Sequence, residues 1–171
     1  MIRNGIRGVT ILLAALASTA VMLAAPLPAF ANGNHLCETY GPHYCLGSAN
    51  LNVNTPVFET TPGRDLFPTQ QAGSFDGYPI FVIQFGADVS KCVAATYGSG
   101  VFVGHCGGTG TVWARVTDSS NVYRWINRYS SQHNPFGFTE YLTGFGLGVD
   151  FDVRPYPPPS GSGQLQRFSW R

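Results

Sequence analysis

The chain has 171 residues, of which 44% are hydrophobic, 13% aromatic and only 11% charged. Ten lysine and arginine residues stand against nine aspartate and glutamate residues, which gives a formal net charge of +1. This near-neutral balance offers no electrostatic case for a nucleic acid or an anionic membrane as a partner. The low charge and the many aromatic residues indicate a folded globule rather than a disordered segment.

The first 31 residues have the pattern of a secretory signal peptide. Two arginines precede 18 apolar residues at 8–25, and Ala29-Phe30-Ala31 matches a small-x-small cleavage site. An N-terminal membrane anchor is the alternative, because 18 apolar residues are just long enough to cross a bilayer. The prolines that follow the stretch and the cleavage site favour removal. The sequence therefore predicts a secreted, extracellular protein with one domain at 32–171 and no membrane contact after signal removal.

All four cysteines of the chain follow this leader. They are Cys37, Cys45, Cys92 and Cys106. Four cysteines allow three connectivities, and proximity in the sequence favours Cys37–Cys45 and Cys92–Cys106. Zinc is the alternative at the first pair, because His35 and His43 each stand two residues before a cysteine. Exported cysteines form disulfides, and the first pair is spaced more widely than zinc ligands usually are. We therefore expect two disulfides, two surface histidines, no metal and no cofactor.

The rest of the chain has the composition of an all-β protein. Glycine and proline recur every few residues and leave little room for a helix. The longest stretch without them, residues 111–134, has β-branched and aromatic segments on both sides of the turn Asp118–Asn121. The predicted strands are 55–60, 79–85, 100–106, 111–116, 121–129, 150–155 and 165–170. Residues 156–163, rich in proline, glycine and serine, are expected to form a surface loop, and the glycine-rich stretch 144–148 a turn.

Three segments of the domain resemble one another. They begin at Tyr44, Lys91 and Glu140, so the period is 47 and then about 50 residues. Cys45 aligns with Cys92, and Leu142 takes the place of the cysteine in the third segment. The aromatic residues that close the units are Phe67, Trp113 and Phe168. Because each unit must close its part of a shared core, we expect these aromatics to be buried. The pattern predicts three units of four short strands.

The second segment resembles the ricin-type β-trefoil lectin repeat. Residues 91–113, "KCVAATYGSGVFVGHCGGTGTVW", have a cysteine-apolar step, a strand, a second cysteine, a glycine-rich turn and a tryptophan in the order of that family. Residues 44–57 match more weakly. The resemblance implies an all-β fold for residues 32–171, a β-trefoil with a pseudo-threefold repeat, and Cys92–Cys106 as its disulfide within a repeat. The leader and the arginine-rich, lysine-poor composition also resemble small secreted actinobacterial proteins.

The sugar-binding residues of that family are not matched. Its active repeats carry an aspartate two residues after the first cysteine, where this chain has Ala94 in the second unit and Gly47 in the first. Gly104 replaces an aromatic stacking platform, and Thr111 replaces the glutamine of a Gln-x-Trp motif. Only the third unit keeps a related motif, at 166–168. The resemblance therefore implies the scaffold but no galactose-type site.

Four other residues are candidates for binding a ligand. They are Tyr97, Asp150, Asp152 and Tyr156. Sugar recognition needs a flat apolar face for the ring, which the two tyrosines offer, and an acceptor for its hydroxyl groups. The two aspartates alternate with Phe151, so on a strand both carboxylates face one side. The alternatives are that the tyrosines cap the core and that the aspartates pair with a cation such as Arg154.

These features favour a secreted, non-catalytic binding protein with a glycan or a cell-surface polysaccharide as its partner. The aspartate pair also suggests a glycosidase or a calcium site, but two carboxylates are too few to predict calcium, and no nucleophile motif accompanies the histidines. A β-trefoil protein-binder such as a protease inhibitor is an alternative, with the loops at 130–138 and 156–163 inserted into a partner. A structural cell-surface protein is another.

Overall fold

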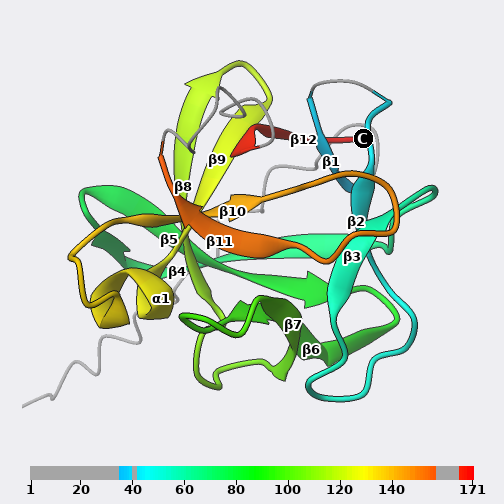
Figure 1. Ribbon diagram of the computed structural model, residues 1–171, viewed down its shortest axis with the longest axis horizontal. Coiled ribbons are helices and arrows are strands. Elements are labelled where there is room, and N and C mark those ends of the chain that lie inside the picture. The colour runs from blue at the N-terminus through cyan, green and yellow to red at the C-terminus, as the bar shows by residue number, and fades with distance from the viewer. Residues whose placement is uncertain (1–34, 40–41, 157–165) are drawn as a thin grey trace, which may run out of the picture.

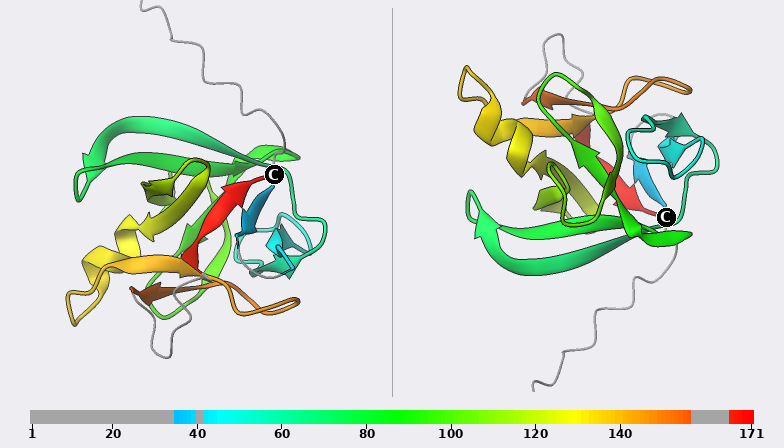
Figure 2. Two further views of the ribbon diagram at one scale, coloured as in Figure 1. Left: turned by 90° about the horizontal axis from the view of Figure 1, so that it is seen from above. Right: turned by 90° about the horizontal axis from the view of Figure 1, so that it is seen from below.

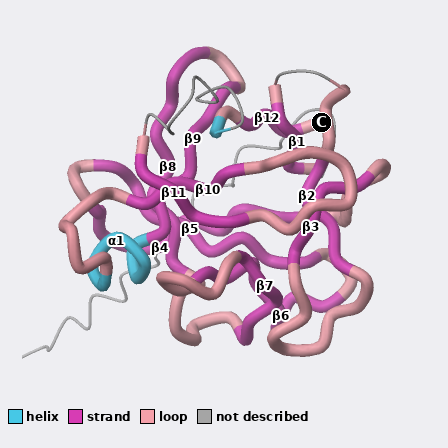
Figure 3. The backbone as a smooth tube through the Cα atoms, in the orientation of Figure 1, coloured by secondary structure: helices cyan, strands magenta, loops and turns pink. Residues whose placement is uncertain are grey.

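The computed structural model describes residues 35–39, 42–156 and 166–171. Within these ranges the chain consists of strands and loops with one short α-helix (Figures 1 and 3). The elements in chain order are β1 (Leu36–Glu38), β2 (Cys45–Ser48), β3 (Val57–Thr60), β4 (Leu66–Phe75), β5 (Tyr78–Phe85), β6 (Asp88–Ala95), β7 (Val101–His105), β8 (Val112–Ser119), β9 (Val122–Asn127), α1 (Arg128–His133), β10 (Glu140–Thr143), β11 (Asp152–Pro155) and β12 (Phe168–Trp170). The predicted signal peptide and most of the predicted loop at 156–163 lie outside the described residues.

Six of the strands form a barrel with one open seam. β1 pairs with β12, β12 with β9, β9 with β8, β8 with β5, and β5 with β4, always antiparallel. His35 and Arg171 exchange two backbone hydrogen bonds, so the two ends of the described domain meet beside β1. Among the described residues β4 and β1 are not paired. An ion pair between His35 Nε2 and Asp65 Oδ1, at 3.2 Å, joins the two sides of the seam.

Three hairpins extend from the barrel. The antiparallel pairs β2–β3, β6–β7 and β10–β11 join it through β1, β5 and β9. Figure 2 shows this arrangement from two sides, with the long, curved β4–β5 hairpin along one edge. The strands divide into unit 1 (β1–β4), unit 2 (β5–β8) and unit 3 (β9–β12). This is a β-trefoil, which confirms the predicted fold.

The core lies inside the barrel and beneath the hairpins. Trp113 and Phe168, the predicted closing aromatics of units 2 and 3, are both fully buried, which confirms that prediction. The prediction for Phe67 is wrong, because its side chain is 40% exposed. Leu66 is buried in its place, and it lies 21 residues after Cys45, just as Trp113 lies 21 residues after Cys92. Successive residues of a strand face opposite sides, so an error of one residue moves a side chain from the core to the surface.

The predicted alignment of the third unit is also wrong by one residue. Leu142 of β10 pairs with Val153. In the same way Val93 of β6 pairs with Val103, and all four side chains belong to the core. Leu142 therefore corresponds to Val93, and Tyr141 takes the place of the cysteine. Unit 3 has no cysteine that could be aligned with Cys45 and Cys92. Its alignment with the other units therefore follows only from the observed strand pairing.

All the predicted strands overlap observed ones, but residues 121–129 divide between two elements. β9 ends at Asn127, whose side chain accepts a hydrogen bond from Ser130 N at 2.9 Å and so caps α1. The strands β1, β2, β4, β6 and β10 are outside the predicted set. β4 contains Pro68 and Gly73. Both residue types are uncommon in strand interiors, so the sequence of this segment does not predict a strand.

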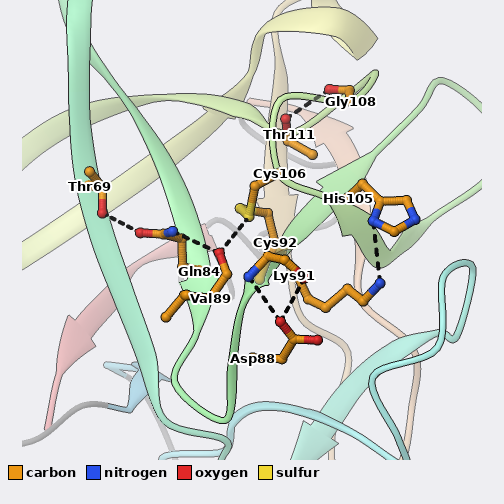
Figure 4. The surroundings of a disulfide bond; sticks show 12 residues. Thr69, Gln84, Asp88, Val89, Lys91, Cys92, His105, Cys106, Gly108 and Thr111 are labelled. Carbon is orange, nitrogen blue, oxygen red and sulfur yellow. Dashed lines mark hydrogen bonds between the residues drawn. A yellow bond between two sulfur atoms is a disulfide. The ribbon is translucent and has the colours of Figure 1, made fainter.

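Both predicted disulfides are formed. Cys37–Cys45 joins β1 to β2, where the two cysteines are direct pairing partners. Cys92–Cys106 joins β6 to the end of β7 (Figure 4). The zinc alternative is wrong, because neither thiol of the first pair is free. Since disulfides persist in oxidising compartments, the two bonds are consistent with an extracellular protein.

Candidate binding groove

One groove gathers most of the candidate ligand residues. It has a volume of about 740 Å³ and is lined by the β6–β7 loop of unit 2 and by the loops and strands of unit 3. We name it the aromatic groove after its aromatic lining, Tyr97, Phe136, Phe138 and Phe145. Asp150 and Asp152 line it as well. The groove therefore combines rings from three separate loops with carboxylates next to β11.

The aromatic side chains of the groove are exposed to solvent. Tyr97 lies in the short β6–β7 loop and Phe145 in the loop between β10 and β11. Phe136 and Phe138 follow α1, and their ring centroids lie 6.4 Å apart. The exposed fraction rises from 40% for Tyr97 to 74% for Phe136. Exposed apolar side chains gathered in one place mark a contact surface rather than an ordinary loop.

A buried amide and a buried carboxyl position the loop after α1. The Asn134 side chain accepts a hydrogen bond from Phe136 N at 2.8 Å, and its amide nitrogen donates to Glu140 Oε1. Glu140 N in turn donates to Ser131 Oγ at 2.9 Å. Glu140 is only 3% exposed, and burial raises the pKa of its carboxyl. β10 thus holds the loop from below, while the phenylalanines remain in contact with solvent.

The two aspartates of the groove differ in their partners. They flank Phe151, which is buried. Asp152 forms an ion pair with Arg154, at 2.7 Å, and accepts a hydrogen bond from Val153 N at 2.8 Å. No described residue pairs with the carboxylate of Asp150, which also lines a second hollow of about 350 Å³. The expected pair with Arg154 is therefore formed by Asp152 alone.

The loop that carries Phe145 is fastened to unit 1. Glu59 of β3 donates its backbone N–H to Val149 O at 3.0 Å and accepts from Gly148 N at 2.8 Å. Its carboxylate accepts a hydrogen bond from Phe145 N. Three hydrogen bonds to one residue fix both ends of the loop, so one wall of the groove depends on a neighbouring unit.

Two buried carboxyls meet beneath this loop. Glu38 is 2% exposed and Glu59 is fully buried. A side chain at Gly144 would overlap both carboxyls, so only glycine fits at this position. Burial, followed by the charge and the hydrogen bond of Glu59, raises the pKa of Glu38 to about 8. His43 does not contact the carboxyls; its Nδ1 lies 3.1 Å from the Glu38 carbonyl oxygen. Glu38 therefore holds a proton at neutral pH.

Tyr156 lies outside the groove. Its ring packs on that of Tyr141, with centroids 5.6 Å apart. The guanidinium of Arg124 lies 4.5 Å from the ring centroid and is held by Asp118 at 2.7 Å. The structure thus brings three of the four candidate residues together and separates Tyr156 from them.

Sequence reasoning missed the phenylalanines of the groove. The sequence predicts residues 130–138 only as a loop for the alternative protein-binding function and residues 144–148 only as a turn, and it assigns a glycan to neither stretch. The available signal is that both stretches place phenylalanine beside glycine or proline, outside any strand that could bury it. Such a residue is a candidate for contact with a partner.

The corresponding hairpin of unit 2 is closed. Ala94 is fully buried, and a Cβ added to Gly104 would lie 2.9 Å from the Ala94 Cβ. A side chain at Gly104 would therefore collide with Ala94. The unit that best matches the lectin repeat in sequence has no room there for the aromatic stacking platform of that family.

Within the part of the chain that the structure describes, no helix is long and apolar enough to span a membrane. The same residues contain no group of three or more histidines, cysteines and carboxylates that could hold a metal ion.

The barrel, the hairpins and the two disulfides define the chain as a disulfide-stabilised β-trefoil, a fold that is compatible with a non-catalytic binding protein. Among solved structures it is similar to a designed threefold symmetric protein, ThreeFoil, with a TM-score of 0.55 and 18% identity over 79% of this chain and 94% of that one. At this identity the likeness shows the fold alone. No protein-family model and no curated protein matches the chain, so the resemblance to ricin-type lectins stays a prediction.

Proposed function

We propose that the chain is a secreted, non-catalytic protein that binds carbohydrate in the aromatic groove. One observation carries the proposal: four exposed aromatic rings share a groove with Asp150, a carboxylate that no described residue neutralises. The apolar face of a sugar ring packs on an aromatic ring, and sugar hydroxyls donate hydrogen bonds to carboxylates. The barrel and the disulfides hold the loops that carry these groups.

The carboxyl groups of the groove support binding without catalysis. Hydrolysis of a glycosidic bond needs two carboxyls that flank the bond, one of them protonated. Asp150 and Asp152 both line the groove, and Arg154 pairs with Asp152. Glu140, whose pKa burial raises, is 3% exposed and hydrogen-bonded to Asn134. Among the described residues that line the groove, the two aspartates are therefore the only carboxyl groups that are not buried.

Isothermal titration with a panel of oligosaccharides tests the proposal. We expect saturable binding of at least one hexasaccharide and no binding of free galactose, because the residues of the usual galactose site are absent. Tyr97→Ala and Phe145→Ala should each weaken binding about tenfold, since each removes a stacking face. Tyr156→Ala is the matched control, because it removes an equally exposed tyrosine outside the groove. Binding that survives both groove substitutions, or no binding by the folded protein, would refute the proposal.

A protein partner is the second candidate, because exposed apolar side chains continue beyond the groove. Leu147, outside the groove lining, is 57% exposed in the β10–β11 loop, and Phe136, at the groove, is 74% exposed after α1. A β-trefoil protease inhibitor inserts loops of this kind into its target. Inhibition in a protease panel that is lost in Phe136→Ala, without any glycan signal, would favour this function over the first.

A further inference from the structure

The described lining of the groove has two aspartates, Asp150 and Asp152, but only one basic residue, Arg154. This guanidinium lies 2.7 Å from Asp152 and neutralises that carboxylate. Asp150 forms no ion pair and no side-chain hydrogen bond with a described residue. A cationic ligand group would therefore find an unpaired carboxylate in the groove.

Glu140 adds a buried carboxyl oxygen that has no hydrogen-bond partner among the described residues. It lines the groove and is 3% exposed. Its Oε1 accepts a hydrogen bond from Asn134, whereas its Oε2 has no hydrogen-bond partner among the described residues. A buried polar atom without a partner costs free energy. A positive charge bound in the groove reduces that cost whenever Glu140 is ionised.

The aromatic lining favours a cation for a separate reason. The face of an aromatic ring carries partial negative charge and attracts ammonium groups within about 6 Å. Tyr97 and Phe145 line the same groove as Asp150. Rings and an unpaired carboxylate together form the environment in which a protonated amine is bound more tightly than a neutral group of the same size.

We propose that the groove selects glycans that carry protonated amino groups, such as oligomers of β-linked glucosamine, over neutral glycans. The ammonium group pairs with Asp150, and the carbon face of the sugar packs on the aromatic lining. The inference rests on the proposed function, because it names the class of glycan that the same groove binds. A neutral glycan supplies hydroxyl hydrogen bonds alone and leaves the charge of Asp150 unbalanced.

Three hexasaccharides of one linkage test the inference: β-1,4-linked glucosamine, N-acetylglucosamine and glucose. Isothermal titration is done at about pH 6, where an amine is protonated and an exposed aspartate is ionised. We expect the glucosamine hexamer to bind at least about tenfold more tightly than the other two. Added salt should weaken its binding much more than that of the neutral hexamers, because salt screens exposed charges.

Asp150→Asn keeps the shape of the side chain and removes its charge. We expect it to abolish the preference for glucosamine and to weaken binding of the neutral hexamers much less than binding of the glucosamine hexamer, because the asparagine amide oxygen still accepts a hydroxyl hydrogen bond but carries no charge. Asp76→Asn is the matched control. It makes the same change of charge in the β4–β5 turn, outside the groove, at a φ of 52° that asparagine also tolerates.

The outcomes separate this inference from the proposed function. Equal binding of all three hexamers refutes the preference for amines and leaves carbohydrate binding standing. A preference that persists in Asp150→Asn, or that Asp76→Asn also removes, refutes the role of Asp150. No binding of any hexamer by the folded protein refutes both the preference and the proposed function.

Discussion

Units 2 and 3 each contain four equivalent strands, but their hairpins, β6–β7 and β10–β11, are held closed in different ways. In unit 2 the β6–β7 hairpin is bridged by Cys92–Cys106, and the loop between its strands is short. In unit 3 the β10–β11 hairpin has no disulfide, and residues 144–151 form a longer loop. That loop is held by Glu59, which belongs to unit 1. Unit 2 therefore closes itself, whereas unit 3 depends on its neighbour.

The difference shows how this β-trefoil separates the scaffold from the proposed binding surface. The covalently closed hairpin has small residues, Ala94 and Gly104, in close contact, and reaches the groove only through its loop, with Tyr97. The hairpin without a covalent bond carries the longer loop, with Phe145, and the aspartates of the groove. Repeats that share a fold are free to diverge in this way, because the barrel and the core keep their positions independent of loop length.

Removal of the disulfide in unit 2 is expected to have the largest effect on stability. The double substitution Cys92→Ala/Cys106→Ala should lower the free energy of unfolding by about 3 kcal/mol, because the unfolded chain regains the freedom of a loop of about 15 residues. Urea unfolding measures the loss. The control, Cys37→Ala/Cys45→Ala, opens a shorter loop and should cost less. A larger loss in the control would show that loop length does not decide how much each disulfide contributes.

The carboxyl pair that supports the unit 3 loop should make the protein more stable in acid. The pKa of Glu38 rises from 4.5 to about 8 on folding, so the folded state binds the proton more tightly. This stabilisation is complete below about pH 4.5 and is lost as the pH rises to about 8. Urea unfolding between about pH 5 and pH 8.5 measures it.

Glu38→Gln identifies the group responsible for this pH dependence. The amide does not titrate, so the variant should lose most of the difference in stability between the two pH values. A smaller slope of the same sign should remain, because burial also raises the pKa of Glu140. Asp76→Asn removes an exposed carboxyl and should leave the slope as in the unmodified protein. An unchanged slope in Glu38→Gln would contradict the assignment.

Gly144→Ala tests the close contact between the unit 3 loop and unit 1. The added methyl group overlaps the carboxyls of Glu38 and Glu59, so the free energy of unfolding should fall by about 2 kcal/mol. Thermal and urea unfolding measure the loss. Leu147→Ala, in the same loop but 57% exposed, should change it by less than about 0.5 kcal/mol. At the position of Gly144, unit 2 carries Ala95, so a neutral result would show that the two hairpins are closed alike.

Arg154→Gln should have the smallest effect. Its ion pair with Asp152 joins side chains that are 55% and 25% exposed, and pairs of this kind contribute about 0–1 kcal/mol. The substitution leaves a second unpaired carboxylate in the groove, so the glucosamine hexamer should bind about threefold more tightly. Titration of the variant measures the change. Weaker binding would show that Arg154 itself contacts the ligand.

The predictions from sequence succeeded where chemistry is local. Alternation of residues along strands, the turn at Asp118–Asn121 and the spacing of the cysteines depend on neighbours within about ten to fifteen residues of the chain. They predicted the fold class, both disulfides and the burial of Trp113 and Phe168. The errors at Phe67 and Leu142 arose where a single residue of register decides which side faces the core, and no local signal marks it.

The groove was predicted only in part, because it is assembled from distant segments. Tyr97 and the aspartates were candidates individually, since an exposed ring or a carboxylate pair is visible in the sequence. Phe136 and Phe145 were not candidates, because the positions of their loops depend on hydrogen bonds to Glu140 of β10 and to Glu59, which are distant in the sequence or visible only in the folded chain. Tyr156 resembles Tyr97 in the sequence, yet it packs against Arg124 elsewhere on the surface.

The sequence by itself determined that this chain forms strands, that its cysteines pair within units, and that three units repeat, because these properties follow from residue periodicity and from short loops between partners. Only the tertiary structure decided where the proposed ligand surface lies. Glu59 of unit 1, Tyr97 of unit 2 and Phe145 of unit 3 are far apart in the sequence. Closure of the barrel brings them together, because pairing of distant strands, and no local pattern, sets which loops become neighbours.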